Sequence, residues 1–111
     1  MATRDELVNL ALDELGVSSV GQTPATEDYE KVDDMVEGLL SRLAGDRVVS
    51  ISDPDSIPDS ISEPLSFLLA ERCFRIFGKP HDMPGRMDAE NRIKRIVASQ
   101  PTYEPATGTH Y

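Results

Sequence analysis

Residues 61–79, ISEPLSFLLAERCFRIFGK, constrain the fold more than any other part of the chain. Wound as a helix from about Ser62 to Gly78, this segment is apolar over well more than half of its circumference. Glu71, Arg72 and Arg75 mark only a narrow polar strip, which we expect to face water. Because so wide an apolar surface must be covered, other apolar elements have to pack around this helix.

The first predicted helix spans residues 3–15. Thr3 and Glu6 have the spacing of a capping box, in which each side chain accepts a hydrogen bond from the other residue's backbone amide. Gly16 follows the last apolar residue and takes up the left-handed backbone that ends helices at little cost. The pattern therefore predicts both ends of this helix.

Two further amphipathic segments supply apolar faces. The second helix is expected over residues 23–45, with Thr23 as its cap and Pro24 at its first position. The fourth is expected over about 84–98, with apolar residues at helical spacing. These faces could bury the central helix in an all-α bundle.

Two segments lack a helical pattern. Residues 47–52, RVVSIS, are rich in β-branched side chains and predict a short extended segment or a minimal hairpin. Residues 100–111 contain two of the chain's prolines and no periodicity, so we expect a flexible tail that orders only on docking. The predicted fold class is thus an all-α, small four-helix bundle, with a helical domain at 1–99 and a tail at 100–111.

Charge is distributed unevenly along the chain. The 111 residues carry a formal charge of −9, which argues against a simple nucleic-acid binder, since such proteins need clustered Lys and Arg. Residues 1–45 carry −7, residues 46–70 carry −4 and residues 71–111 carry +2. No apolar stretch is long enough to span a membrane, so we expect no membrane association.

Residues suited to catalysis are few. The chain has two histidines, His81 and His110, and one cysteine, Cys73, which falls inside a helix and is expected to be buried. The acidic loop at 53–59 lacks the glycine and the final glutamate of a calcium-binding EF-hand loop. We therefore predict no enzymatic activity, no cofactor and no metal site.

The order of these segments resembles that of a known family. LVNLALDELGV, GQTPATEDYEKVDDMVEGLLSRL and IPDSISEPLSFLLAERCFRIFGK follow one another as in the phage head-to-tail adaptor proteins, also called head completion or packaged-DNA stabilisation proteins. The resemblance covers about residues 3–98. Its features are a helix ending in Leu-Gly-Val, a Gly-x-Thr-Pro helix start, an acidic second helix and a helix ending in Phe-Gly-Lys.

The resemblance implies a structural virion protein. Members assemble as a homo-oligomeric ring, commonly of twelve copies, between the portal protein and the tail or stopper proteins of a tailed phage. Such a ring extends the DNA channel, through which DNA passes without sequence-specific binding, and provides the surface on which the tail docks. The expected location is the neck of the virion, after synthesis in the host cytoplasm.

Two sets of residues follow as candidate contact sites. The resemblance implies that the C-terminal segment of the chain, residues 100–111, docks on the portal. This segment contains Tyr103, Glu104, Pro105, His110 and Tyr111. Unlike charged faces and outward-facing aromatic residues would join neighbouring copies of the chain. This predicted subunit interface or acidic surface comprises Glu30, Asp33, Asp34, Glu37, Phe67, Phe74, Arg86, Arg92 and Arg95.

Two other functions are compatible with the sequence. A small acidic helical module could bind a basic protein or mimic DNA, and it would be a monomer or dimer. A small helical homodimer could instead be an enzyme with a site lined by Arg72, Arg75 and Arg86, although nothing in the sequence indicates a substrate. The oligomeric state and the partner distinguish these hypotheses from the ring.

Overall fold

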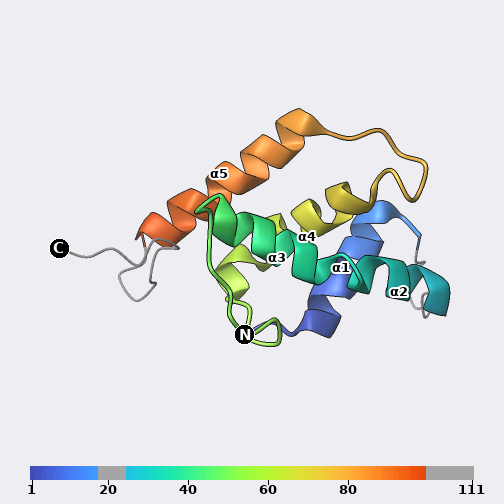
Figure 1. Cartoon of the computed structure of the whole chain (residues 1–111), viewed down its shortest axis with the longest axis horizontal. Coiled ribbons are helices and arrows are strands. Elements are labelled where there is room, and N and C mark those ends of the chain that lie inside the picture. Colours follow the sequence, from blue (N-terminus) through green and yellow to red (C-terminus); the bar gives the residue numbers. More distant parts are fainter. Residues whose placement is uncertain (18–24, 100–111) are drawn as a thin grey trace.

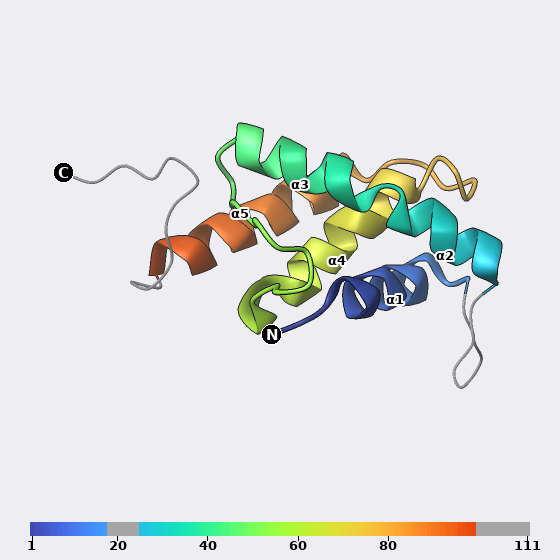
Figure 2. The same cartoon turned by 60° about the horizontal axis from the view of Figure 1, so that its bottom comes forward.

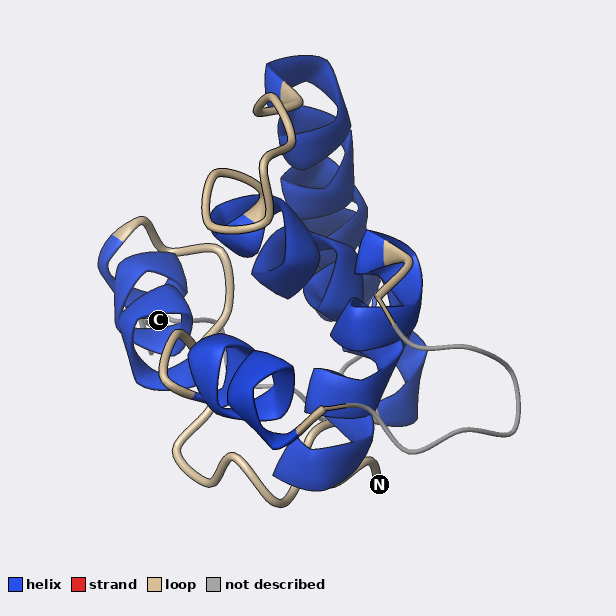
Figure 3. Cartoon of the chain, turned by 90° about the vertical axis from the view of Figure 1, so that its right-hand side faces the viewer, coloured by secondary structure: helices blue, strands red, loops and turns tan. Residues whose placement is uncertain are grey.

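The structure, a computed structural model, describes residues 1–17 and 25–99. In this part of the chain helices are joined by loops and turns, and no strand is formed (Figure 3). The all-α prediction is therefore confirmed. The helices are α1 (Arg4–Leu15), α2 (Thr26–Asp33), α3 (Val36–Gly45), α4 (Asp59–Cys73) and α5 (Met83–Ser99).

The strongly apolar helix, α4, lies at the centre of the fold. Figures 1 and 2 show α1 and α5 beside it, with α3 crossing over it and α2 continuing from α3 toward α1. Nine of its 15 residues are buried, and Leu65 and Leu69 are fully inaccessible to solvent. The other helices thus cover the wide apolar arc within a single copy of the chain.

The predicted polar strip of this helix is only partly correct. Arg75 is exposed and Arg72 is partly buried, but Glu71 is buried, with 3% of its surface exposed. The prediction for Glu71 was wrong because the loop after the helix folds back, and His81 and the Asp82 amide contact its carboxylate. Helical periodicity places Glu71 on the helix surface but says nothing of this covering loop.

Capping signals predicted the helix ends well. The Thr3–Glu6 capping box is formed, and Gly16 has the left-handed backbone (φ 74°) that ends α1. Residues 74–78 continue α4 as successive turns, and Gly78 (φ 75°) closes them. There the Lys79 amide donates to the Phe74 carbonyl at 2.8 Å, as in a Schellman motif.

The expected helix over 23–45 is divided into α2 and α3. At the junction the Met35 amide donates to the Val32 carbonyl, three residues back, instead of continuing the four-residue ladder. Val32 and Val36 are both fully buried on either side of the break. The break thus preserves the apolar face. The predicted cap, Thr23 and Pro24, lies outside the described residues.

The segment at 47–52 forms neither a strand nor a hairpin. Instead, Val48 and Val49 insert into the core, where each is 3% exposed. β-Branched residues fit a core as well as a sheet, and here no neighbouring segment offers a strand. A single antiparallel bridge forms elsewhere: the Ala2 amide donates to the Ile57 carbonyl at 2.7 Å, and the Ile57 amide donates to that of Ala2 at 2.9 Å.

Cys73 is fully buried near the end of α4, and burial raises the pKa of its thiol from 9.0 to about 11. We expect the native protein at pH 8 to react with a thiol reagent at least about 100-fold more slowly than the denatured protein, since only the thiolate reacts. Absorbance of the released chromophore with and without denaturant measures both rates. Equal rates would contradict the burial of Cys73.

No helix in residues 1–17 and 25–99 is long and apolar enough to cross a membrane. The predicted tail at 100–111 lies outside the described residues.

Candidate functional site

Arg4 joins the start of α1 to the α2–α3 junction. Its Nε donates to Asp33 Oδ1 at 2.7 Å, and its Nη1 and Nη2 donate to the two carboxylate oxygens of Glu37 at 2.7 and 2.9 Å. Nη2 also donates to the Asp33 carbonyl at 3.0 Å. Two acidic residues predicted to lie on an open acidic surface are therefore engaged within the chain.

Contacts between α1 and the α2–α3 region shift the pKa values of several ionisable groups. Hydrogen bonding to Glu37 and Asp33 raises the pKa of Arg4, and the Arg4 guanidinium lowers the pKa of Glu37. The Tyr29 hydroxyl donates to Asp5 Oδ1 at 2.6 Å, which together with burial raises the pKa of Tyr29 to about 12. These contacts fasten α2 to α1.

Other carboxylates of this region remain free to meet a partner. Glu27, Glu30 and Asp34 are exposed, and no ion pair engages them among the described residues. We call these three residues the acidic face of α2. In Figures 1 and 2, α2 lies at the opposite end of the molecule from the C-terminal end of α5.

Phe67 and Phe74 do not form the expected outward-facing patch. Both are partly buried and pack against the core, and their rings meet edge to face with centroids 6.3 Å apart. Exposure was overestimated because the neighbouring α5 helix covers part of α4, which periodicity alone does not reveal. Among residues 1–17 and 25–99, the large apolar side chains that are exposed are Met1, Leu10, Ile76, Met83 and Met87.

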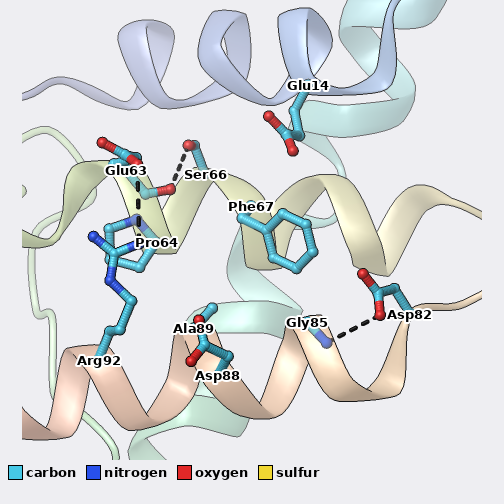
Figure 4. Close-up of a pocket in the computed structure, with 10 residues that line it drawn as sticks. All are labelled: Glu14, Glu63, Pro64, Ser66, Phe67, Asp82, Gly85, Asp88, Ala89 and Arg92. Carbon is cyan, nitrogen blue, oxygen red and sulfur yellow. Dashed lines mark hydrogen bonds and ion pairs between the residues drawn. The ribbon is translucent and has the colours of Figure 1, made fainter.

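A cleft of about 240 Å³ opens between α1, α4 and α5 (Figure 4). Phe67 lies in its middle, and Arg92 reaches across one end toward Glu63, with Nη1 and Oε1 3.9 Å apart. Three further carboxylates line the walls, so acidic groups outnumber basic ones. We call this site the acidic cleft; its charged residues are Glu14, Glu63, Asp82, Asp88 and Arg92.

The first turn of α5 shapes one end of this cleft. Asp82 Oδ1 accepts a hydrogen bond from the Gly85 amide at 3.0 Å, which caps the helix. A Cβ added at Gly85 would lie 2.3 Å from Asp82 Oδ2 and 2.9 Å from Cζ of Phe67. Glycine is therefore needed here for the cap and the aromatic ring to approach α5 together.

A second pocket, of about 140 Å³, lies between α3, α4 and the start of α5. Arg42, Arg72 and Arg86 line it, one from each helix, and two buried leucines, Leu39 and Leu68, contribute to its walls. Its other residues are Glu71 and His81. We call this site the arginine pocket.

The carboxylate of Glu71 is held by two donors from the α4–α5 loop. His81 Nδ1 lies 2.8 Å from Glu71 Oε2, and the Asp82 amide donates to the same oxygen at 3.3 Å. The nearby guanidinium groups add favourable electrostatic surroundings for a buried charge. Glu71 thus fixes the α4–α5 loop, whose His81 lines the arginine pocket and whose Asp82 lines the acidic cleft.

The predicted basic residues occupy different places. Arg86 lines the arginine pocket, with its Nε 4.0 Å from Glu90, whereas Arg92 lines the acidic cleft. Arg95 is exposed on α5. Of the three arginines of the hypothetical enzyme site, Arg72 and Arg86 meet in one pocket, and Arg75 does not line it.

The predicted contact residues of the C-terminal segment lie outside the described residues: Tyr103, Glu104, Pro105, His110 and Tyr111.

Sequence reasoning missed two members of the arginine pocket, Arg42 and Glu71. One signal was available. Gly38 interrupts an otherwise good helical pattern, and a Cβ there would lie 2.9 Å from Arg72 Nη2. A glycine inside a helix often marks a close approach by another group, and here that group is the guanidinium.

The chemical repertoire of these sites is electrostatic. No group of three or more His, Cys, Asp or Glu residues in the described parts of the chain could hold a metal ion. The only cysteine is buried, with a raised pKa, and is therefore a poor nucleophile. The arrangement can bind charged groups of opposite sign at separate places.

Comparison of the chain with models of protein families, with curated proteins and with solved structures finds no match.

Proposed function

We propose that this protein is a structural subunit of a homo-oligomeric ring that connects the portal and the tail of a tailed-phage particle. In this role it extends the DNA channel, has no enzymatic activity and occupies the neck of the virion. The resemblance of its segments to head-to-tail adaptor proteins suggests the place of action, and the distribution of charged sites supports assembly.

The observation that carries the proposal is that one subunit presents unlike charged surfaces on different helices. The acidic face of α2 lies at one end of the molecule, and the arginine pocket lies between α3, α4 and α5. A ring needs a heterologous contact, in which one surface of a subunit meets a different surface of the next. Surfaces of opposite sign on different helices favour such a contact.

The overall charge also suits a wall around DNA. Each copy carries −9, and the acidic cleft adds a concentrated negative site between α1, α4 and α5. Repeated around a ring, this charge would repel the phosphate backbone at close range and let the genome slide.

The direct test measures particle mass and shape. We expect light scattering of the purified chain, alone and mixed with a portal ring, to detect an oligomer with many copies. Negative-stain images should show closed rings, and images of phage necks should contain the chain. Bovine serum albumin mixed with the same portal is the control for non-specific adsorption.

A monomer that stays monomeric with the portal, together with necks that lack the chain, would end the proposal. In that case the acidic cleft favours a second candidate, a small acidic module that binds a basic side chain of another protein. Phe67 and four carboxylates around a cavity of about 240 Å³ suit a Lys or Arg side chain. A one-to-one complex with a basic peptide, detected by calorimetry, would support this alternative.

A further inference from the structure

We propose that the arginine pocket binds a carboxylate side chain from the acidic face of α2 on a neighbouring copy of the chain. This inference rests on the proposed ring and names the chemistry of one of its contacts. The acidic face consists of Glu27, Glu30 and Asp34, which are exposed and form no ion pair in the described part of the chain.

Positive charges outnumber negative ones in the arginine pocket. Arg42, Arg72 and Arg86 contribute three permanent positive charges. Two carboxylates lie close by: Glu90 forms a short ion pair with Arg42, and Glu71 is buried with its oxygen held by the loop. Arg72 has no ion-pair partner among the described residues, so the pocket retains a positive charge.

Two arginines of the pocket also have unused hydrogen-bond donors. The Nε atoms of Arg42 and Arg72 are both buried, and neither has a hydrogen-bond partner in the described residues. Buried polar atoms in folded proteins nearly always have a partner, so each exception needs an explanation. A carboxylate that binds these guanidinium groups and displaces the atoms now covering Nε would provide one.

The shape and chemistry of the arginine pocket suit a carboxylate. A guanidinium offers a planar pair of donors that matches the two oxygens of a carboxylate. The buried leucines and the volume of about 140 Å³ suit one small group with a short apolar stem, as in Glu or Asp. A nucleic-acid strand fits less well, because the chain's charge of −9 repels an extended polyanion.

The acidic face of α2 on a neighbouring copy can supply the carboxylate. Asp33 and Glu37 are engaged by Arg4 within the same chain, which leaves the acidic face of α2 as a protruding set of free carboxylates. These residues and the arginine pocket belong to different helices. Joining one to the other between copies therefore makes a head-to-tail contact that a closed ring can repeat.

The first experiment tests the pocket without assembly. Side-chain Nε–H signals of Arg42 and Arg72 are followed by NMR during titration with acetate, and with chloride and phosphate at equal ionic strength. We expect acetate to shift these signals more than the other anions do, and Arg72→Gln to weaken acetate binding about tenfold. Arg95→Gln, which changes an exposed arginine of α5, should bind acetate as the wild type does.

A second variant guards against misfolding. Gly38→Ala adds a methyl group 2.9 Å from Arg72 Nη2, and it should displace the guanidinium while raising helix propensity. We expect weaker acetate binding with no loss of thermal stability. Equal acetate binding by the wild type, Arg72→Gln and Gly38→Ala would overturn the proposed site, as would a preference for phosphate.

The final experiment tests the neighbouring copy by mixing two damaged subunits. One carries Arg72→Gln and keeps its acidic face; the other carries Glu27→Gln, Glu30→Gln and Asp34→Asn and keeps its arginine pocket. Each alone should fail to form rings, and an equal mixture should give dimers, because only one good contact can form. Sedimentation velocity measures these sizes.

The outcomes separate the two proposals. Rings formed by either damaged subunit alone, while the wild type also forms rings, would overturn the carboxylate contact and leave the ring intact. A wild type that forms no rings, even with a portal, would end the proposed ring, and with it the contact between copies. The NMR titration would then still report whether the pocket binds a carboxylate.

Discussion

Replacing Leu65 by alanine is expected to lower the free energy of unfolding by about 3 kcal/mol. Leu65 is fully buried in α4, the helix around which the others pack. The substitution removes apolar contacts and leaves a space that rigid neighbouring helices fill only in part. For a domain of this size the loss should lower the Tm by about 12 °C or more.

Leu10→Ala is the matched control for this variant. It removes the same atoms from another helix, α1, but from a side chain that is 42% exposed. We expect a change of no more than about 0.5 kcal/mol. Urea titrations followed by circular dichroism measure both variants. Similar losses in the two proteins would mean that α4 is not the centre of the core.

Replacing Arg4 by glutamine is expected to lower the free energy of unfolding by about 1.5 kcal/mol. The loss is moderate because the Arg4 and Asp33 side chains are 26% and 33% exposed, so water competes for their charges. All four hydrogen bonds of the guanidinium that join α1 to the α2–α3 junction disappear together. The Tm of the variant should be about 8 °C lower than that of the wild type.

The pH dependence of this variant gives an independent check. Arg4 lowers the pKa of Glu37 below its ordinary value of 4.5. The stabilisation from this pair is therefore fully present above that value and is lost as the pH falls through the lower, folded-state pKa. The gap in stability between the wild type and Arg4→Gln should shrink in acid.

Arg95→Gln is the control for Arg4→Gln, since Arg95 is exposed and forms no ion pair in the described residues. We expect its stability to match that of the wild type within about 0.5 kcal/mol at every pH. A gap for Arg4→Gln that stays constant down to acidic pH would contradict the role of Glu37.

Much of the fold could be predicted from local patterns. The capping box of Thr3 and Glu6, the left-handed Gly16 and the apolar arc of α4 all act within one or two helical turns. Such signals are readable in a sequence because the interacting residues are close along the chain. The division of residues 23–45 was missed because its apolar face is continuous across the break.

The candidate site was predicted only in outline. The acidic character of the second helical region and the basic character of α5 were visible as charge, but their pairings were not. Arg4 lies 29 residues before Asp33, and Arg42 lies 48 residues before Glu90, so no local pattern connects them. The helical pattern predicts a water-facing Glu71, but the following loop covers its carboxylate.

By itself, the sequence determined that this protein is helical, where α1 begins and ends, and that α4 must be covered. These properties depend on hydrogen bonding and side-chain periodicity within a few residues. Only the tertiary structure decided which carboxylates Arg4 engages and which arginines share a pocket. Charged groups interact through space over a few ångströms, and the packing of distant segments sets those distances.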